Sequence, residues 1–282
     1  MGFLNMTVIS TQKDQFGIDS WTNRIIAYID ILGIKKHVQD ESNESKKKLL
    51  QLLKIFHDAN SSYEPNKVFE KIQRGPISVE FVKTQLEISN FSDHVIFSAL
   101  LSENCKHTQN NQINAVIEKI QEMSLRVLQI GFLIRGAITI GDMYHLGNSI
   151  IGKGLNEAVF LEENIAIYPR VIVSDDILKI LNKNQTNGFL TYNFILKKDF
   201  DGVTFIDFLH RHRHGDEASD IDLRQIKFAI ESEINKSINR KDVKTLTKLR
   251  WFANYFNDTF ITWGVKNNHL ISALEPIEPI TL

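Results

Sequence analysis

The sequence predicts an α+β fold in which an antiparallel or mixed sheet carries helices on one face. Two apolar runs, at about residues 24–31 and 132–141, have the β-branched composition of buried strands. A long extended region at 77–100 is broken by Asn, Ser and Asp residues that suit a hairpin turn. Amphipathic helices at about 45–58 and 110–130 separate these strands. The resulting order, β–α–β–β–α–β–(hairpin)–α–β–α, is typical of an α+β sandwich.

The individual elements rest on periodicity and on breakers. The first helix follows from apolar residues at helical spacing, and Gly131 ends the second. The hairpin bends near residues 89–93, which places Asp93 at its mouth. A second hairpin crosses Asp142 to Ile151, and a short helix at about 154–164 follows it. A strand at about 168–173 and a helix that begins after Ser174 complete this part of the chain.

Three segments differ in character. Residues 1–22 form a lead-in without clear periodicity, and residues 23–185 form the main domain. Residues 186–282 form a C-terminal α/β extension, which we expect to pack on the core or on a dimer. In this extension we expect strands at about 189–196 and 202–209, followed by two amphipathic helices.

Composition excludes several classes of protein. The 282 residues carry 33 Lys+Arg against 34 Asp+Glu, a formal net charge of −1, so no bulk attraction to nucleic acid or to an anionic membrane is expected. The one cysteine, Cys105, cannot form a disulfide within the chain and fits a reducing cytosol. No apolar run approaches the length of a membrane span. These observations predict a cytoplasmic protein without a nucleic-acid or membrane partner.

Two aspartates are the candidate chemical residues. Asp30 lies near the end of the first apolar strand, where an uncompensated charge costs several kcal/mol, and Asp93 lies at the hairpin mouth. If these strands are neighbours, the two carboxylates repel unless a proton or cation lies between them. A pair of Mg²⁺ or Mn²⁺ ions is the usual solution in phosphoryl transfer. The alternative is structural, since Asp30 could cap the turn that follows it.

The turn after Asp30 suits a phosphate. Gly33 lets the chain turn sharply, and the backbone N–H groups around Leu32, Gly33 and Ile34 would then face phosphate oxygens.

Four motifs occur in the order found in the class III nucleotidyl cyclases. Residues 30–34, DILGI, resemble the D-I-x-G-F motif, and residues 90–93 lie where that family places its second metal aspartate. Residues 135–141 resemble its R-x-G-I-x-x-G strand. Residues 149–158 resemble its D-x-W-G-x-x-V-N-x-A segment. The resemblance covers about residues 23–185.

The resemblance implies a fold, a reaction and an assembly. The fold would be the palm-type, ferredoxin-like sheet of the class III cyclases. Asp30 and Asp93, with the carbonyl of Ile31, would bind two Mg²⁺ or Mn²⁺ ions. The ribose 3′-oxygen would attack the α-phosphate of a nucleoside triphosphate, and pyrophosphate would leave. Asn156 would orient the ribose from the second chain of a homodimer with composite sites.

Three positions depart from the family pattern. Ser89 and Ser149 stand where adenylyl cyclases carry the lysine and the acidic residue that select a purine, so both are candidate base-contacting residues. Phe160 stands where the transition-state arginine is expected. Arg135, Arg170 or Lys153 could supply the missing positive charge. Of these, Arg135 is our candidate catalytic residue and Lys153 a candidate nucleotide-binding residue.

Several hypotheses about function remain open. The motifs look most like the pyrimidine cyclases of bacterial Pycsar antiphage systems, which implies a cyclic UMP or cyclic CMP synthase, with UTP favoured over CTP. The product would activate a separate effector. The alternative is a cyclase-like module that binds a nucleotide or a partner without turnover, which Phe160 favours. A palm protein of the polymerase or diguanylate cyclase type is disfavoured, because no G-G-D-E-F-type hairpin is present.

Overall fold

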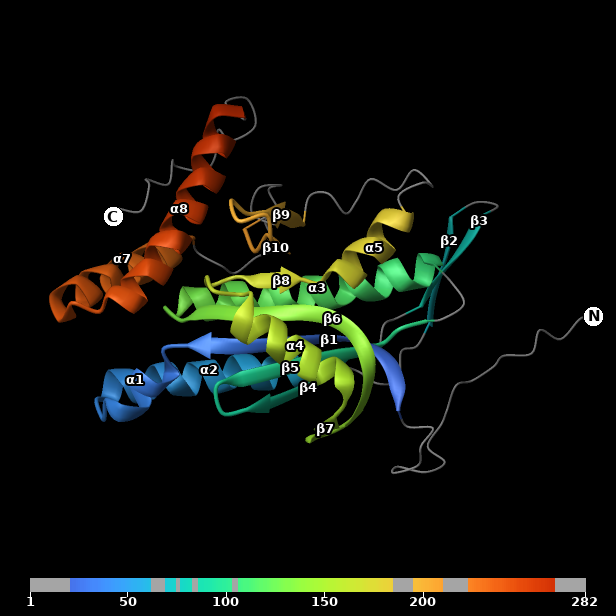
Figure 1. The fold of residues 1–282 in the computed structure, drawn as a ribbon, viewed down its shortest axis with the longest axis horizontal. Helices are drawn as coiled ribbons and strands as arrows, with labels where there is room; N and C mark the ends of the chain where they lie inside the picture. The colour runs from blue at the N-terminus through green and yellow to red at the C-terminus, as the bar shows by residue number, and fades with distance from the viewer. Residues whose placement is uncertain are drawn as a thin grey trace, which may run out of the picture.

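The chain folds around one eight-stranded sheet with helices on both faces (Figure 1). The computed structural model describes residues 21–61, 69–74, 77–82, 86–102, 106–184, 195–209 and 223–266. The strands are β1 (Thr22–Leu32), β2 (Phe69–Arg74), β3 (Ile77–Val82), β4 (Leu86–Phe91), β5 (His94–Leu100), β6 (Leu133–Leu146), β7 (Ser149–Ile151), β8 (Val171–Val173), β9 (Leu196–Lys198) and β10 (Thr204–Ile206). The helices are α1 (Ile34–Gln39), α2 (Asn43–Ser61), α3 (Lys106–Gln129), α4 (Lys153–Asn164), α5 (Asp175–Asn184), α7 (Leu223–Arg240) and α8 (Val243–Lys266).

Strand β1 lies inside the sheet, between β5 and β6. The strand order is β4-β5-β1-β6-β8-β10-β9, with β7 paired to β6 and a separate β2–β3 hairpin. β1 pairs antiparallel with β5 and β6, while the β6–β8 pair is parallel. In this register Asp30 lies opposite His94 on one side and opposite Arg135 on the other. The sheet therefore places these three residues side by side.

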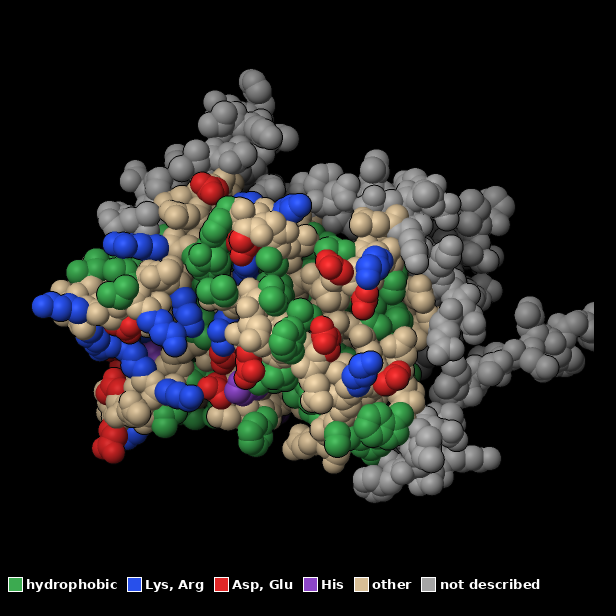
Figure 2. Space-filling model, in the orientation of Figure 1, with side chains coloured by type: hydrophobic (Ala, Val, Ile, Leu, Met, Phe, Trp, Pro, Cys, Tyr) green, Lys and Arg blue, Asp and Glu red, His purple; other side chains and the backbone are tan. Residues whose placement is uncertain are grey.

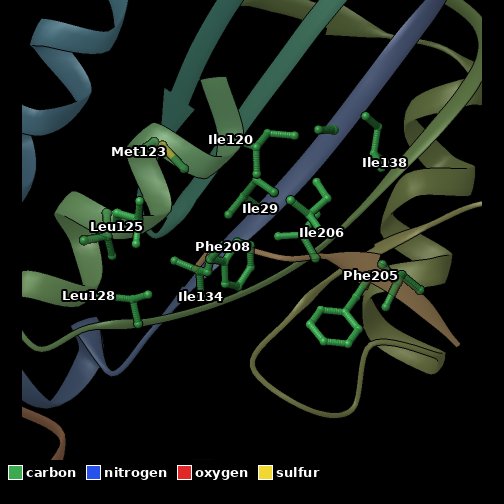
Figure 3. Packing of buried hydrophobic residues seen from close by; sticks show 14 of the residues in the cluster. Ile29, Ile120, Met123, Leu125, Leu128, Ile134, Ile138, Phe205, Ile206 and Phe208 are labelled. Atoms are coloured by element: carbon green, nitrogen blue, oxygen red, sulfur yellow. The ribbon is translucent and has the colours of Figure 1, made fainter. Parts of the chain in front are cut away.

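One face of the sheet carries the large apolar core. Alternate residues of β1, including Ile25 and Ile29, pack with Ile117 and Ile120 of α3 and belong to the same buried cluster as Phe252 of α8. Figure 3 shows part of this packing, with Ile29 and Ile120 near one another. The C-terminal helices therefore share the core of the main sheet.

The opposite face carries α4, which lies across β1 and β6 in Figure 1. A second, smaller cluster of Ile26, Met143 and Ala158 fills this contact. The helix approaches closely because Gly141 and Gly154 face each other, and a Cβ on either residue would come within 3 Å of the other's backbone. The sequence predicted this helix but placed all helices on one face of the sheet, and the structure corrects this by placing α4 on the opposite face.

Most predicted elements are confirmed. The α+β class, the strand–helix order through α5 and the hairpin with Asp93 in its turn are all present. The structure adds the short helix α1 and the β2–β3 hairpin. Of the two strands expected in the extension, β9 and β10 are each three residues long, and residues 185–194 lie outside the described part. Residues 1–20 of the expected lead-in also lie outside it. None of the helices searched in the described part is long and apolar enough to cross a membrane.

Candidate functional site

A cavity of about 540 Å³ opens where the end of β1 meets the first turns of α8. This volume lies in the range of small-molecule sites. The cavity is lined by Asp30, Ile31, Leu32, Gly33, Ile34, Lys35, Asp93, Arg135, Glu163, Ile167, Tyr168, Lys244, Thr247 and Lys248. The predicted site residues from β1, from the β4–β5 turn and from β6 are therefore brought together.

The two aspartates lie on either side of one imidazole. His94 Nδ1 is 3.3 Å from Asp93 Oδ1, and His94 Nε2 is 3.9 Å from Asp30 Oδ1. The backbone N–H of Ile31 donates to the Asp93 carbonyl at 2.8 Å and fixes the hairpin turn against β1. Burial raises the pKa of Asp30, although the Arg135 guanidinium opposes this shift. The carboxylate is therefore held in a setting that favours a further cation.

Gly33 begins α1 in the left-handed conformation, with a φ of 96°. This conformation suits glycine and turns Leu32, Gly33 and Ile34 into the cavity lining, as the sequence predicts for a turn at this point. The Ile31 amide differs from the rest of the turn, because its hydrogen bond to Asp93 leaves it unable to donate to a ligand.

Arg135 lies between two carboxylates. Its Nη2 is 3.3 Å from Asp30 Oδ2 and 2.5 Å from Glu162 Oε1. Its Nε is buried without a hydrogen-bond partner among the described residues. Burial raises the pKa of Glu162 to about 7, against the opposing effect of Arg135. Glu162 was not among the residues predicted from the sequence, although its place one turn after the buried Ala158 is a signal that it faces the sheet.

Three predicted residues lie outside the cavity of this chain. Asn156, Lys153 and Ser149 are exposed, the first two on α4 and the third on β7. Asn156 lies seven residues before Glu163, which corresponds to roughly 10 Å along the helix axis. Within one chain, Asn156 is not part of the cavity lining.

Ser89 also lies outside the cavity, in a buried hydrogen-bonded chain that we call the closed network: Arg24, Glu87, Ser98, His145 and Ser89. Arg24 Nε donates to Ser98 Oγ at 3.0 Å, and Ser98 Oγ lies 2.7 Å from His145 Nδ1. His145 Nε2 lies 2.8 Å from Ser89 Oγ, which donates to the Gly147 carbonyl at 2.5 Å. Because Ser89 uses its proton there, its oxygen must accept from His145 Nε2–H, which leaves Nδ1 to accept from Ser98. Ser89 thus has little capacity left for a ligand.

Arg170 does not serve the cavity. Its side chain is fully buried, forms ion pairs with Asp199 and Asp201, and packs against the rings of Tyr168 and Trp251. This arrangement ties the start of β8 to the β9–β10 turn and to α8. Arg170 is therefore a structural residue, and it is not a source of the positive charge missing at Phe160.

Helix α8 contributes three residues to the cavity that the sequence analysis did not single out, namely Lys244, Thr247 and Lys248. They lie far from the motifs along the chain, in the segment that the family resemblance does not cover. Lys248 is half-buried, and burial together with the Arg135 charge lowers its pKa. The only sequence signal is their spacing, which places all three on one helix face.

The donor atoms near β1 fit a hard divalent cation. Asp30, Asp93 and Ile31 line the cavity, and carboxylate and carbonyl oxygens are the ligands that such cations prefer. No group of three or more His, Cys, Asp or Glu side chains suited to a metal is found among the residues that the structure describes. Mg²⁺ needs only one or two carboxylates when phosphates and water supply its other ligands. The donor set therefore fits a cation that arrives with a phosphorylated ligand.

Comparisons with known proteins give only remote structural likenesses. No protein-family model and no curated protein matches the sequence. A class III adenylyl cyclase-like ATP-binding protein from Pseudomonas aeruginosa is similar over 57% of this chain and 35% of its own length, at 12% identity and a TM-score of 0.33. The catalytic core of a rhodopsin-guanylyl cyclase with converted specificity, in complex with ATPαS, is similar over 66% of this chain and 95% of its own, at 11% identity and a TM-score of 0.34. The chain thus spans about a third of the length of the first structure.

Proposed function

We propose that this protein is a nucleotidyl cyclase of the class III type that converts a pyrimidine nucleoside triphosphate, UTP in preference to CTP, into its 3′,5′-cyclic monophosphate and pyrophosphate. The observation that carries the proposal is the meeting of Asp30 and Asp93 beside the Gly33 turn in one cavity. These are the residues that the motif resemblance assigns to metal binding, and they come from separate parts of the sequence. A structural cap at Asp30 would not require the second carboxylate.

Each cavity residue then has a task. Asp30, Asp93 and the Ile31 carbonyl would hold two Mg²⁺ or Mn²⁺ ions, which when bound acidify the ribose 3′-hydroxyl and neutralise the triphosphate. Arg135 lines the cavity beside Asp30, so its guanidinium could donate to an oxygen of the α-phosphate as negative charge develops there. Glu162 forms an ion pair with the same Nη2 and would keep the guanidinium oriented.

A second copy of the chain would complete the site. Asn156 is exposed outside the cavity of its own chain, so in this proposal it orients the ribose in the partner's cavity. Lys153 and Ser149 are exposed near the start of the same helix and would approach the nucleotide from the same side. The apolar side chains of Ile151 and Phe160, 61% and 54% exposed, also lie on β7 and α4 and suit burial in a homodimer.

The preference for a pyrimidine rests on what replaces the purine-selecting pair. Ser149 offers a small exposed hydroxyl, and Ser89 offers a hydroxyl whose proton is already donated to Gly147. Neither carries the charge that reads a purine in adenylyl cyclases. In the same proposal the cyclic nucleotide acts as a second messenger for a separate effector in antiviral defence of the Pycsar type.

Incubation of the purified protein with each of the four nucleoside triphosphates and Mn²⁺ tests the proposal, with products separated by mass. We expect a 3′,5′-cyclic pyrimidine monophosphate. Turnover of ATP alone would contradict the pyrimidine assignment, and turnover of none would contradict the enzyme.

Mixing variants tests the composite site. Asp30→Asn and Asn156→Ala homodimers should each be inactive, whereas co-expression should restore about a quarter of the activity, because half of the dimers are mixed and carry one intact site. No recovery, with mixed dimers shown to form, would place Asn156 and Asp30 in the same chain's site.

A second candidate is a cyclase-like module that binds nucleotide without turnover. Phe160 favours it, because an exposed aromatic ring cannot replace a transition-state guanidinium. Binding of a triphosphate with no product from any of the four would support this reading.

A further inference from the structure

We infer that Lys244 and Lys248, on the first turns of α8, bind the terminal phosphates of the triphosphate and receive the charge of the leaving pyrophosphate. The inference rests on the proposed function, which brings a triphosphate into the cavity. It also gives the C-terminal extension a direct part in the site, in addition to its packing in the core.

The position of the two lysines is the first support. Both line the cavity that Asp30, Asp93 and Arg135 also line. They are four residues apart on a helix, with Thr247 between them, so their side chains lie on the same face. Lys248 is close enough to Asp30 and Arg135 for their charges to affect its pKa. A phosphate held near Asp30 would therefore lie within the field of this lysine.

The second support is the pairing of the two lysines within the part of the chain that the structure describes. Within the described part of the chain neither forms an ion pair, although Lys248 is half-buried. The neighbouring helix differs, since Lys227 pairs with Glu231 at 3.4 Å and Lys236 with Glu233 at 3.0 Å. A partly buried ammonium beside Arg135 is unfavourable unless an anion compensates it. A bound polyphosphate would supply that anion.

The third support is that the two arginines considered for this role already contact carboxylates. Arg135 already lies between Asp30 and Glu162, and Arg170 is held by two aspartates outside the cavity. Apart from Arg135, the cationic residues in the lining are Lys35, Lys244 and Lys248. Figure 2 shows Lys and Arg side chains gathered on the side of the molecule where α1, α7 and α8 lie. Two of the three lysines that remain for the terminal phosphates therefore come from α8.

Binding measurements test the inference without turnover. The probes are inorganic tripolyphosphate, 3′-deoxy-UTP, which lacks the hydroxyl that would be cyclised, and UMP, titrated calorimetrically into the full-length protein in the presence of Mg²⁺. We expect Lys248→Gln to weaken both polyphosphates by about 10-fold, and Lys244→Gln/Lys248→Gln by about 100-fold. The monophosphate should change by less than about 3-fold, because it lacks the terminal phosphates.

Arg250→Gln is the matched control. Arg250 is exposed on the same helix, two residues beyond Lys248 and therefore on a different face, and it does not line the cavity. The Arg250→Gln variant removes one positive charge, as Lys248→Gln does, so it measures any long-range electrostatic effect on binding. We expect its polyphosphate affinity to stay within about 2-fold of that of the wild type.

The outcomes separate this inference from the proposed function. The wild type could bind tripolyphosphate and make no cyclic product, while the double variant loses the binding. This result would support the phosphate-binding role of the lysines and contradict the proposed cyclase activity. The wild type could instead be an active cyclase while the folded double variant keeps normal polyphosphate affinity. This result would contradict the role of the two lysines and leave the proposed function standing. A wild-type protein that binds neither polyphosphate would overturn both.

Discussion

The α4 side of the sheet carries two polar clusters with different degrees of pairing. In the closed network the hydrogen bonds all run in one direction. Arg24 donates to Ser98, Ser98 to His145, His145 to Ser89, and Ser89 to the Gly147 carbonyl. In the cavity, one guanidinium is shared by two carboxylates, and Arg135 Nε has no partner among the described residues. Burial alone does not distinguish the clusters, because both contain buried charged or polar side chains.

The difference indicates what each cluster does. A fully paired buried network fixes one arrangement of its strands, and it needs no ligand. The carboxylates and the guanidinium of the second cluster line an open cavity, where a ligand can complete their pairing. The closed network is accordingly expected to act on stability, and the cavity cluster on binding and turnover.

The largest expected effect is on turnover. Asp30→Asn keeps the shape of the side chain but removes the charge that would hold a divalent cation, so we expect cyclase activity to fall on the order of 10³-fold. Because burial already raises the pKa of Asp30, the neutral amide should be tolerated. The thermal midpoint is therefore expected to remain within about 3 °C of that of the wild type.

Activity assays and thermal denaturation of the same preparations check this expectation. An active Asp30→Asn protein would remove the metal assignment. A protein that unfolds would instead show that Asp30 belongs with the structural residues.

The closed network should respond in the opposite way. Arg24→Met removes the partner of Glu87 at 2.6 Å and the donor to Ser98 at 3.0 Å. We expect a loss of about 3 kcal/mol in the free energy of unfolding, because breaking a buried pair leaves the other charge uncompensated. Triphosphate affinity per folded molecule should be unchanged. Urea denaturation followed by binding measurements below the transition tests both statements, and a stable variant with weakened binding would reverse the roles of the clusters.

The pH dependence of stability isolates His145. Burial, together with the Arg24 charge, lowers the pKa of His145 from 6.5 to about 4, so the folded state holds the neutral imidazole. The stabilisation is present above pH 6.5 and is lost as the pH falls toward 4. Between pH 7 and pH 5 the loss should be about 2 kcal/mol.

His145→Gln provides the control for other acid-titrating groups. The stability difference between wild type and variant should shrink by this amount over the same interval in urea titrations. A stability difference that stays constant with pH would mean that the pKa of His145 is the same in the folded and unfolded states.

The sequence predicted the parts of the fold that depend on local pattern. The continuous apolar run of β1, the turn at Gly33 and the hairpin bend before Asp93 each carry a signal within a few residues. The motif order then placed Asp30, Asp93 and Arg135 in one region, and the register of β1 brings Asp30 beside Arg135.

The residues that the sequence did not predict act through distant contacts. Glu162 resembles any charged helix residue until α4 is placed on the sheet, and Lys248 resembles a solvent-exposed lysine until α8 is placed beside β1. Ser89 was expected at the nucleotide from its position in the motif. That position does not show that His145 lies beside it and hydrogen-bonds to its hydroxyl. Pairing of this kind depends on tertiary packing, which a single sequence does not specify.

The smallest expected effects separate the two serines. Ser89→Ala removes the hydrogen bonds to His145 and Gly147 and should lower the free energy of unfolding by about 1 to 2 kcal/mol. Ser149 is exposed on β7, so Ser149→Ala should change the free energy of unfolding by less than about 0.5 kcal/mol. If the exposed hydroxyl contacts the base, Ser149→Ala alone should alter the ratio of UTP to CTP turnover. Urea denaturation and competition between the two substrates measure these effects. An altered ratio in Ser89→Ala with no loss of stability would move Ser89 from the closed network to the nucleotide.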